Sequence, residues 1–118
     1  MIPFKNRFHG HNSLTYTYKN GQTIRTKLFT LRFCTNPRKR FSRVAVVVSK
    51  KIAKKAVKRN FMRRRLYNII HHYIDNFTQH YDLIIMVNSL DVMTIDFHEL
   101  KQKLVDELQN TGIIANSQ

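Results

Sequence analysis

The sequence predicts a single α/β domain with one central sheet. Its 118 residues, of which 42% are hydrophobic, are enough for one packed core. Two short apolar runs, 43–49 and 82–88, are typical of buried strands. Two longer stretches, 62–73 and 96–110, have the spacing of amphipathic helices. We find no internal repeat, no linker and no sign of a second domain.

Residues 13–20 are open to two interpretations. Leu14, Tyr16 and Tyr18 alternate with polar residues, which favours a strand. A polar N-cap before this segment and Gly21 after it favour a short helix instead. Local propensity alone favours the strand, because the intervening threonines are β-branched.

Residues 23–34 are predicted to form one half-buried strand. Phe29, Leu31 and Phe33 lie at alternate positions, so they share one face of that strand and belong to the core. Cys34 at its end is most simply a small core residue.

Residues 43–49 (RVAVVVS) are apolar on both faces, which is typical of a central strand. The loop 35–43 has a turn at Asn36-Pro37, and it would join this strand to the preceding one as an antiparallel hairpin. Residues 82–88 (DLIIMVN) are a second buried strand, and residues 89–95 are expected to form a loop.

The helix between these two strands changes character along its length. Its C-terminal half has an apolar stripe with the spacing i, i+4, i+7, i+8 and i+11. The stripe consists of Met62, Leu66, Ile69, Ile70 and Tyr73. The same side continues toward the N-terminus as Arg63, Arg59 and Lys55. We expect the C-terminal half to pack on the core and the N-terminal half to present cations on nearly every side.

Residues 96–110 are predicted to form the last helix. Asp96 as N-cap, with Glu99 three residues later, resembles a capping box, and Gly112 ends the helix. Its buried stripe is Phe97, Leu100, Leu104 and Leu108. We expect one domain over residues 1–118, with a core at about 5–110 and a C-terminal tail at 111–118.

Charge is distributed very unevenly along the chain. Nineteen of the 21 Lys and Arg residues precede position 75, whereas all seven acids lie from Asp75 onward. Residues 50–65 hold nine cations and no acid, although solvated helices usually alternate the two signs. Such a density of like charge repels itself unless a polyanion neutralises it. The sequence therefore predicts nucleic acid as the first candidate partner and an anionic membrane as the second.

Two features favour structured RNA as that nucleic acid. Asn60 has poor helix propensity but can donate and accept hydrogen bonds to a base edge or a 2′-hydroxyl. Arg59 beside it offers a planar fork for phosphate. Tyr16 and Tyr18 could stack unpaired bases, whereas the nearby Phe29 and Phe33 are better explained as core residues.

Catalysis by the protein's own side chains is poorly supported. The sequence has no triad spacing and no Gly-rich phosphate loop, and the basic half has no paired carboxylates. The pairs His9-x-His11 and His71-His72 could act as acid and base or as metal ligands. Structural roles are favoured for both, because no Cys or carboxylate nearby completes a ligand set. We predict no catalytic residue and no metal ligand.

Compartment signals point to the cytoplasm. A single cysteine excludes an internal disulfide, and there is no apolar run of about 18 residues that could span a membrane. The N-terminus lacks the apolar core of a signal peptide. We expect a cytoplasmic protein without a membrane partner.

The stretch SKKIAKKAVKRNFMRRRL, residues 49–66, resembles the signature of the protein subunit of bacterial ribonuclease P. In that signature a lysine pair, an Ala-Val and an Arg-Asn are followed by further basic residues. The segments NRF, KNG, RVAVVVSKK, DLIIMV and DFHEL also fall in the family's order and spacing. The resemblance covers roughly residues 5–110.

The resemblance implies a single α/β domain in the order α-β-β-β-α-β-α. Its four-stranded mixed sheet would include a left-handed βαβ crossover, against the right-handed default, in a fold shared with a ribosomal small-subunit protein domain. Residues 13–20 would then be a helix, and we adopt that prediction over the local preference for a strand.

The resemblance also implies a function without protein catalysis. The RNA subunit, with Mg²⁺, would hydrolyse precursor tRNA to release its 5′ leader. The protein would help to bind that RNA, hold the leader in a cleft on its sheet and raise the affinity for catalytic metal ions. The implied partners are ribonuclease P RNA and precursor tRNA, and we expect no obligate protein partner.

The resemblance implies part of the site position by position. Arg59, Asn60, Arg63 and Arg64 fall on the family's RNA-contacting helix motif, Lys50, Lys51 and Lys55 on its flanking basic positions, and Tyr18 on an aromatic position of the leader cleft. The predicted contacts with the RNA subunit are Lys54, Lys55, Lys58, Arg59, Asn60, Arg63, Arg64 and Arg65. The predicted leader cleft consists of Leu14, Tyr18, Phe33, Lys50, Lys51 and Asn88. The chain departs from the family pattern at Leu14, where an aromatic is usual, at Asn88-Ser89, where Arg-Pro is common, and at Ala53, where glycine is usual.

Three other functions would fit a small basic protein. A ribosomal protein that binds ribosomal RNA without a role in cleavage is the main alternative. A DNA-binding architectural protein is disfavoured by Asn60 and the aromatics, and a nuclease acting alone is disfavoured by the missing acid/base groups.

Overall fold

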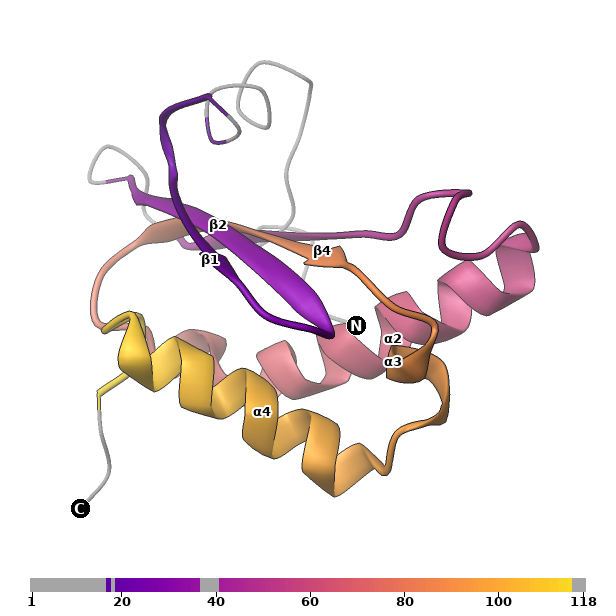
Figure 1. Ribbon diagram of the computed structural model, residues 1–118. Helices are drawn as coiled ribbons and strands as arrows, with labels where there is room; N and C mark the ends of the chain where they lie inside the picture. The colour runs from indigo at the N-terminus through magenta and orange to yellow at the C-terminus, as the bar shows by residue number, and fades with distance from the viewer. Residues whose placement is uncertain (1–16, 18, 37–40, 116–118) are drawn as a thin grey trace.

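The computed structural model describes residues 17, 19–36 and 41–115. One layer of helices covers one face of a four-stranded sheet (Figure 1). The elements follow the order β-β-β-α-β-α-α, with one 3₁₀ turn before the last strand. They are β1 (Gln22–Arg25), β2 (Phe29–Thr35), β3 (Arg43–Val47), α2 (Ala56–Tyr73), η2 (Ile74–Asn76), β4 (Tyr81–Val87), α3 (Asp91–Thr94) and α4 (Phe97–Asn110).

The sheet has the strand order β1-β2-β4-β3. β1 pairs with β2 and β2 with β4 in antiparallel fashion, whereas β3 and β4 are parallel. The expected hairpin between β2 and β3 is therefore wrong, because β4 lies between them. β3 is also an edge strand of the described sheet rather than a central one. The mixed sheet and the strand–helix–strand connection from β3 through α2 to β4 agree with the fold that the family resemblance implies.

The predicted single strand at 23–34 is divided into β1 and β2. The backbone turns between them, where the N–H of Thr26 donates to the carbonyl of Phe29 at 2.9 Å. The Thr26 hydroxyl also donates to that carbonyl, at 2.6 Å. Neither glycine nor proline marks this turn, so its signal in the sequence is weak.

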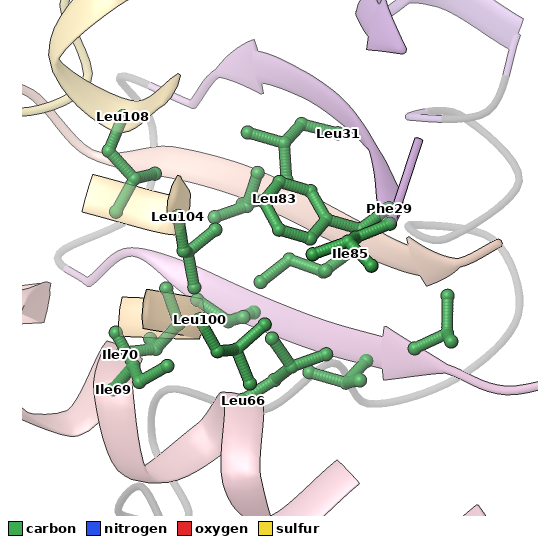
Figure 2. Packing of buried hydrophobic residues seen from close by; sticks show 14 of the residues in the cluster. Phe29, Leu31, Leu66, Ile69, Ile70, Leu83, Ile85, Leu100, Leu104 and Leu108 are labelled. Atoms are coloured by element: carbon green, nitrogen blue, oxygen red, sulfur yellow. The ribbon is translucent and has the colours of Figure 1, made fainter. Parts of the chain in front are cut away.

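The hydrophobic core lies between one face of the sheet and helices α2 and α4 (Figure 2). Leu31 of β2, Ile85 of β4 and Val46 of β3 lie in one register row across the sheet. The first two are fully buried, and Val46 is 6% exposed. Phe29 and Phe33 are core residues, as predicted.

α2 is anchored by the predicted stripe. Met62, Leu66, Ile69 and Ile70 are all completely buried. The phenol of Tyr67 adds a polar anchor, because it accepts a hydrogen bond from the N–H of Val46 on the edge strand β3, at 3.0 Å. The C-terminal half of α2 is thus fixed on the sheet.

α4 begins and ends as the sequence predicts. The Asp96 carboxylate accepts hydrogen bonds from the N–H groups of His98 and Glu99, at 3.1 and 3.2 Å. Gly112 has a φ of +79°, the left-handed conformation that follows many helices. The expected loop at 89–95, in contrast, contains the short helix α3.

The core extends beyond residue 110. Ile113 is fully buried, and Ile114 is 4% exposed and forms a β-bridge with Phe77. The N–H of Thr78 donates to the carbonyl of Ile113 at 2.8 Å. The first residues of the expected tail therefore pack against the segment that precedes β4.

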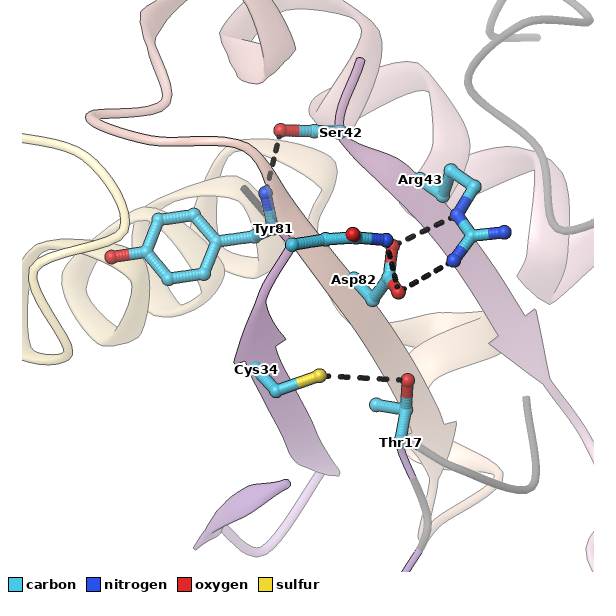
Figure 3. Close-up of polar contacts among 7 residues, drawn as sticks. Thr17, Cys34, Ser42, Arg43, Tyr81 and Asp82 are labelled. Atoms are coloured by element: carbon cyan, nitrogen blue, oxygen red, sulfur yellow. Dashed lines mark hydrogen bonds and ion pairs between the residues drawn. The ribbon is translucent and has the colours of Figure 1, made fainter. Parts of the chain in front are cut away.

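The opposite face of the sheet carries a polar row (Figure 3). Cys34, Asp82 and Arg43 are register partners on β2, β4 and β3. The guanidinium of Arg43 donates to both Asp82 oxygens, at 2.9 and 2.6 Å, and the Asn36 amide donates to Oδ2 at 2.9 Å. This buried ion pair joins the two parallel strands at the start of β3.

Cys34 is half-buried rather than fully buried as expected. Its sulfur lies 3.8 Å from the hydroxyl of Thr17, and burial raises the pKa of its thiol. Thr17, Lys19 and Asn20 have helical conformation, in agreement with the helix that we adopted for this segment.

Candidate RNA interface

The cation-rich segment forms one end of the molecule, which we call the basic pole. It comprises the loop after β3 and the first half of α2, and its first turns project past the sheet (Figure 1). Its nine cations are Lys50, Lys51, Lys54, Lys55, Lys58, Arg59, Arg63, Arg64 and Arg65. The loop is held by the carbonyl of Ser49, which accepts from the N–H groups of Ile52 and Ala53 at 3.1 and 3.2 Å.

Arg59 fastens this loop to the helix. Its Nη1 donates to the carbonyls of Ala53 and Lys54, at 3.0 and 2.7 Å. The side chain is half-buried, so only part of the guanidinium is available to a phosphate. Arg59 therefore shapes the basic pole as well as adding charge to it.

Lys54, Lys55, Lys58 and Arg64 are exposed. No ion pair between described residues neutralises any of them. The N-cap of α2 is Lys55, which makes no side-chain capping bond, and the first turn contains no acid. Unsatisfied N–H groups and the positive end of the helix dipole thus add to the cationic charge. This end of α2 is complementary to an anion.

Asn60 and Arg63 form a pair on the exposed side of the same helix. The Arg63 guanidinium donates to the side-chain oxygen of Asn60, one turn earlier. This bond orients the guanidinium and leaves the exposed Asn60 amide nitrogen as a donor. The structure therefore pairs Asn60 with Arg63, whereas Arg59 contacts carbonyls of the preceding loop.

Arg65 has a different environment from the one predicted. Its guanidinium donates to three backbone carbonyls, those of Val92, Met93 and Ile95, at 2.7, 3.1 and 2.6 Å. Its Cζ also lies 5.7 Å from the ring centroid of Phe61 and 5.8 Å from that of Phe97. Arg65 thus joins α2 to the segment around α3, and its predicted contact with RNA stays a prediction.

The predicted leader cleft is described only in part. Lys50 and Lys51 are exposed beyond the C-terminal end of β3. Asn88 follows the C-terminal end of β4, which lies on the same side of the sheet because the two strands are parallel. The Asn88 amide donates to the Thr26 carbonyl and the Thr30 hydroxyl, at 3.0 and 2.8 Å. Phe33 is only 5% exposed and belongs to the core, so it offers no stacking surface. The two remaining predicted cleft residues, Leu14 and Tyr18, lie outside the described residues.

Two exposed apolar residues of the basic pole were not among the predicted site residues. Phe61 is 44% exposed and Val57 is 78% exposed, one helical turn apart on α2. Neither belongs to the buried stripe that begins at Met62. Their position off that stripe is the signal in the sequence that could have identified them.

Other candidate sites gain little support. His71 and His72 are exposed in the last turn of α2, and His9 and His11 lie outside the described residues. Among the residues that the structure describes, no group of three potential metal ligands is found, and no helix is long and apolar enough to cross a membrane. A cavity of about 570 Å³ between the β1–β2 turn and helices α3 and α4 includes no residue of the basic pole.

A model of the ribonuclease P family matches residues 2–112. The chain belongs to the ribonuclease P protein family. A ribonuclease P protein component from Prochlorococcus marinus (strain AS9601) is 35% identical over 121 residues, which cover 92% of this chain and 91% of that protein. A ribonuclease P protein component from Pseudanabaena sp. (strain PCC 6903) is 26% identical over 110 residues, covering 93% of this chain and 90% of that protein.

Solved structures share the fold. The RNase P protein from Staphylococcus aureus has a TM-score of 0.81 at 19% identity, over 92% of this chain and 97% of that chain. The RNase P protein from Thermotoga maritima has a TM-score of 0.76 at 21% identity, over 88% of this chain and 96% of that chain. Together with the family match, these similarities support the ribonuclease P interpretation over the ribosomal alternative.

Proposed function

We propose that this ribonuclease P protein binds the catalytic RNA subunit through its basic pole and assists removal of the 5′ leader from precursor tRNA. The observation that carries the proposal is the uncapped, acid-free start of α2, with Lys54, Lys55, Lys58 and Arg64 exposed around it. Membership of the ribonuclease P protein family supports ribonuclease P RNA as the polyanion that this surface would bind.

The proposed mechanism is electrostatic and structural. Two RNAs that approach each other repel through their phosphates, and cations placed between them lower that repulsion. The exposed lysines and Arg64 supply these cations, while the Arg63–Asn60 pair supplies hydrogen bonds with a fixed direction. Each phosphate contact releases counterions, so binding becomes weaker as salt increases.

The leader is proposed to follow the sheet edge beside the basic pole. Lys50 and Lys51 are exposed there, and the parallel β3 and β4 bring Asn88 to the same edge. Leu14 and Tyr18, which the family resemblance assigns to the cleft, lie outside the described residues and stay predictions. Phe33 is left out because its ring is buried.

Mg²⁺ is assigned to the RNA partner. This ion takes oxygen ligands, and residues 50–65 contain no carboxylate that could supply them. The basic pole would act on the metal indirectly, by neutralising phosphates and so reducing the number of cations that the folded RNA needs from solution. No protein side chain takes part in hydrolysis under this proposal.

Reconstitution tests this function. The protein is mixed with a bacterial ribonuclease P RNA and precursor tRNA at a low Mg²⁺ concentration, at which the RNA alone cleaves slowly. Cleavage at the mature 5′ end should appear only when protein and RNA are both present. Absence of stimulation, with an RNA from a closely related bacterium as well, would refute the proposal.

A matched pair of variants assigns the effect to the basic pole. Lys54→Ala with Lys58→Ala should reduce the stimulation. Lys101→Ala with Lys103→Ala removes the same net charge from α4, which is outside the basic pole, and should leave the stimulation intact.

A further inference from the structure

Phe61 is an exposed aromatic residue within a cationic surface. Its side chain is 44% exposed on the first half of α2, although Met62 beside it is fully buried. Residues three and four positions away lie next to a side chain on the same helix face. For Phe61 these neighbours are Val57, Lys58, Arg64 and Arg65. Three of the four are cations, so this face suits a polyanion better than an apolar protein surface.

Arg65 supports the ring of Phe61. Its Cζ lies 5.7 Å from the ring centroid, within the range of a cation–π contact. Arg65 is itself held by carbonyls at 2.6 to 3.1 Å. Phe61 is thus placed against a fixed guanidinium and still leaves almost half of its surface to solvent. A stacking partner would find this ring already ordered, which reduces the entropy lost on binding.

Nucleic acids offer one apolar surface to such a ring, which is the face of an unpaired base. Bases in an RNA duplex are stacked on each other, whereas bases in loops and bulges can stack on aromatic side chains. The surrounding lysines and arginines would bind the phosphates on either side of that base.

We propose that Phe61, supported by Arg65, is a stacking site for one unpaired nucleobase of the RNA subunit. This inference rests on the proposed function and names a specific contact within it. It differs from the phosphate contacts, because a stacked base adds affinity without releasing counterions.

Affinity measurements test the stack. Phe61→Leu keeps an apolar side chain but removes the π-face, and should weaken binding to ribonuclease P RNA by about 5- to 150-fold, the equivalent of about 1 to 3 kcal/mol per stacked base. Phe61→Tyr should bind like the wild type. Val57→Ala changes an exposed apolar residue one turn away and serves as the control. The slope of affinity against salt should be the same for all four proteins.

A spectroscopic readout tests the stack directly. The chain contains no tryptophan, so Phe61→Trp introduces a single indole at the proposed site, which can be excited selectively over the five tyrosines. Its fluorescence should be strongly quenched when RNA binds, because the indole lies against a base. Phe77→Trp places the same fluorophore beside Tyr81, outside the basic pole, and should respond little.

Failure of this inference is distinct from failure of the proposed function. If the wild type binds the RNA but Phe61→Leu binds equally well and the fluorescence of the Phe61→Trp variant is not quenched, the stacking site is refuted and the proposed function stands. If Phe61→Leu changes only self-association, measured by sedimentation, the face is a protein contact and the proposal is also refuted. If the wild type does not bind the RNA, both proposals fail.

Discussion

At the scale of single residues, neighbouring cations of the basic pole differ sharply in environment. Arg64 is exposed, whereas the guanidinium of Arg65 donates to three backbone carbonyls and lies against two aromatic rings. The sequence offers no way to distinguish them, because the carbonyls that Arg65 contacts lie 27 to 30 positions further along the chain. The density of charge could therefore be predicted from the sequence, but which of these cations contact other parts of the protein could not.

This difference predicts that replacement by methionine affects stability at position 65 but not at position 64. Arg65→Met should lower the free energy of unfolding by about 2 to 4 kcal/mol, because it removes charged donors from buried or half-buried carbonyls. Arg64→Met should change that free energy by less than about 0.5 kcal/mol but weaken RNA binding. Urea unfolding measures both variants. Equal stability of the two would contradict the structural role of Arg65.

Cys34 gives a prediction about pH. Burial raises the pKa of its thiol, so the neutral form is favoured in the folded protein. The rate of alkylation in the native protein should therefore keep rising at pH values where a free thiol, with a pKa of about 8.5, has already levelled off. For the same reason this group destabilises the fold as the pH rises above the pKa of the unfolded chain. Alkylation of the urea-unfolded protein is the control, and an identical midpoint in both states would contradict the prediction.

At the scale of elements, the two ends of α2 differ. Its C-terminal half packs on the core, whereas its first turn lacks a capping side chain. Its C-terminal half was predictable, because the stripe from Met62 to Tyr73 follows directly from helical periodicity. Its N-terminal end has no capping side chain and no acid, which is unfavourable for an isolated helix. An anion bound at this end would therefore stabilise the helix.

A capping side chain at the N-terminus of α2 should raise the stability of the protein and lower its affinity for RNA. Lys55 has the extended backbone of an N-cap, with φ −80° and ψ 129°. Lys55→Asp should raise the free energy of unfolding by about 1 kcal/mol and weaken RNA binding. Lys55→Ser separates the two effects, since it supplies a cap while removing one charge instead of reversing it. A Lys55→Asp variant that is no more stable than the wild type, in thermal unfolding, would contradict this account of the helix end.

At the scale of the whole molecule, pairing between strands was the part that the sequence predicted least well. The apolar run at 43–49 indicated a buried strand, and β3 does bury Val44 and Val46, but a run of this kind does not specify its neighbours. β3 pairs with β4, whose register partners lie about 39 positions away, so the contact is invisible to local patterns. The family resemblance carried that information, because it implied the order of elements and the crossover.

Charge is also uneven across the whole molecule. Nine of the 21 Lys and Arg residues are in the basic pole, whereas four of the seven acids, Asp96, Glu99, Asp106 and Glu107, are on α4 or at its N-cap. The excess of cations at the basic pole favours its approach to a polyanion.

The salt dependence of RNA affinity tests the central claim most directly, that exposed cations of the basic pole neutralise phosphates of the RNA subunit. The slope of log affinity against log salt is measured for the wild type, for Lys54→Ala with Lys58→Ala, and for Lys101→Ala with Lys103→Ala. Each lost phosphate contact lowers the slope by about 0.7 to 0.9, so the first variant, which lacks two lysines, should lose about 1.4 to 1.8. The α4 variant, which has the same net charge as the first variant, should keep the wild-type slope. Equal slopes for all three proteins, or an equal loss in both variants, would contradict the account.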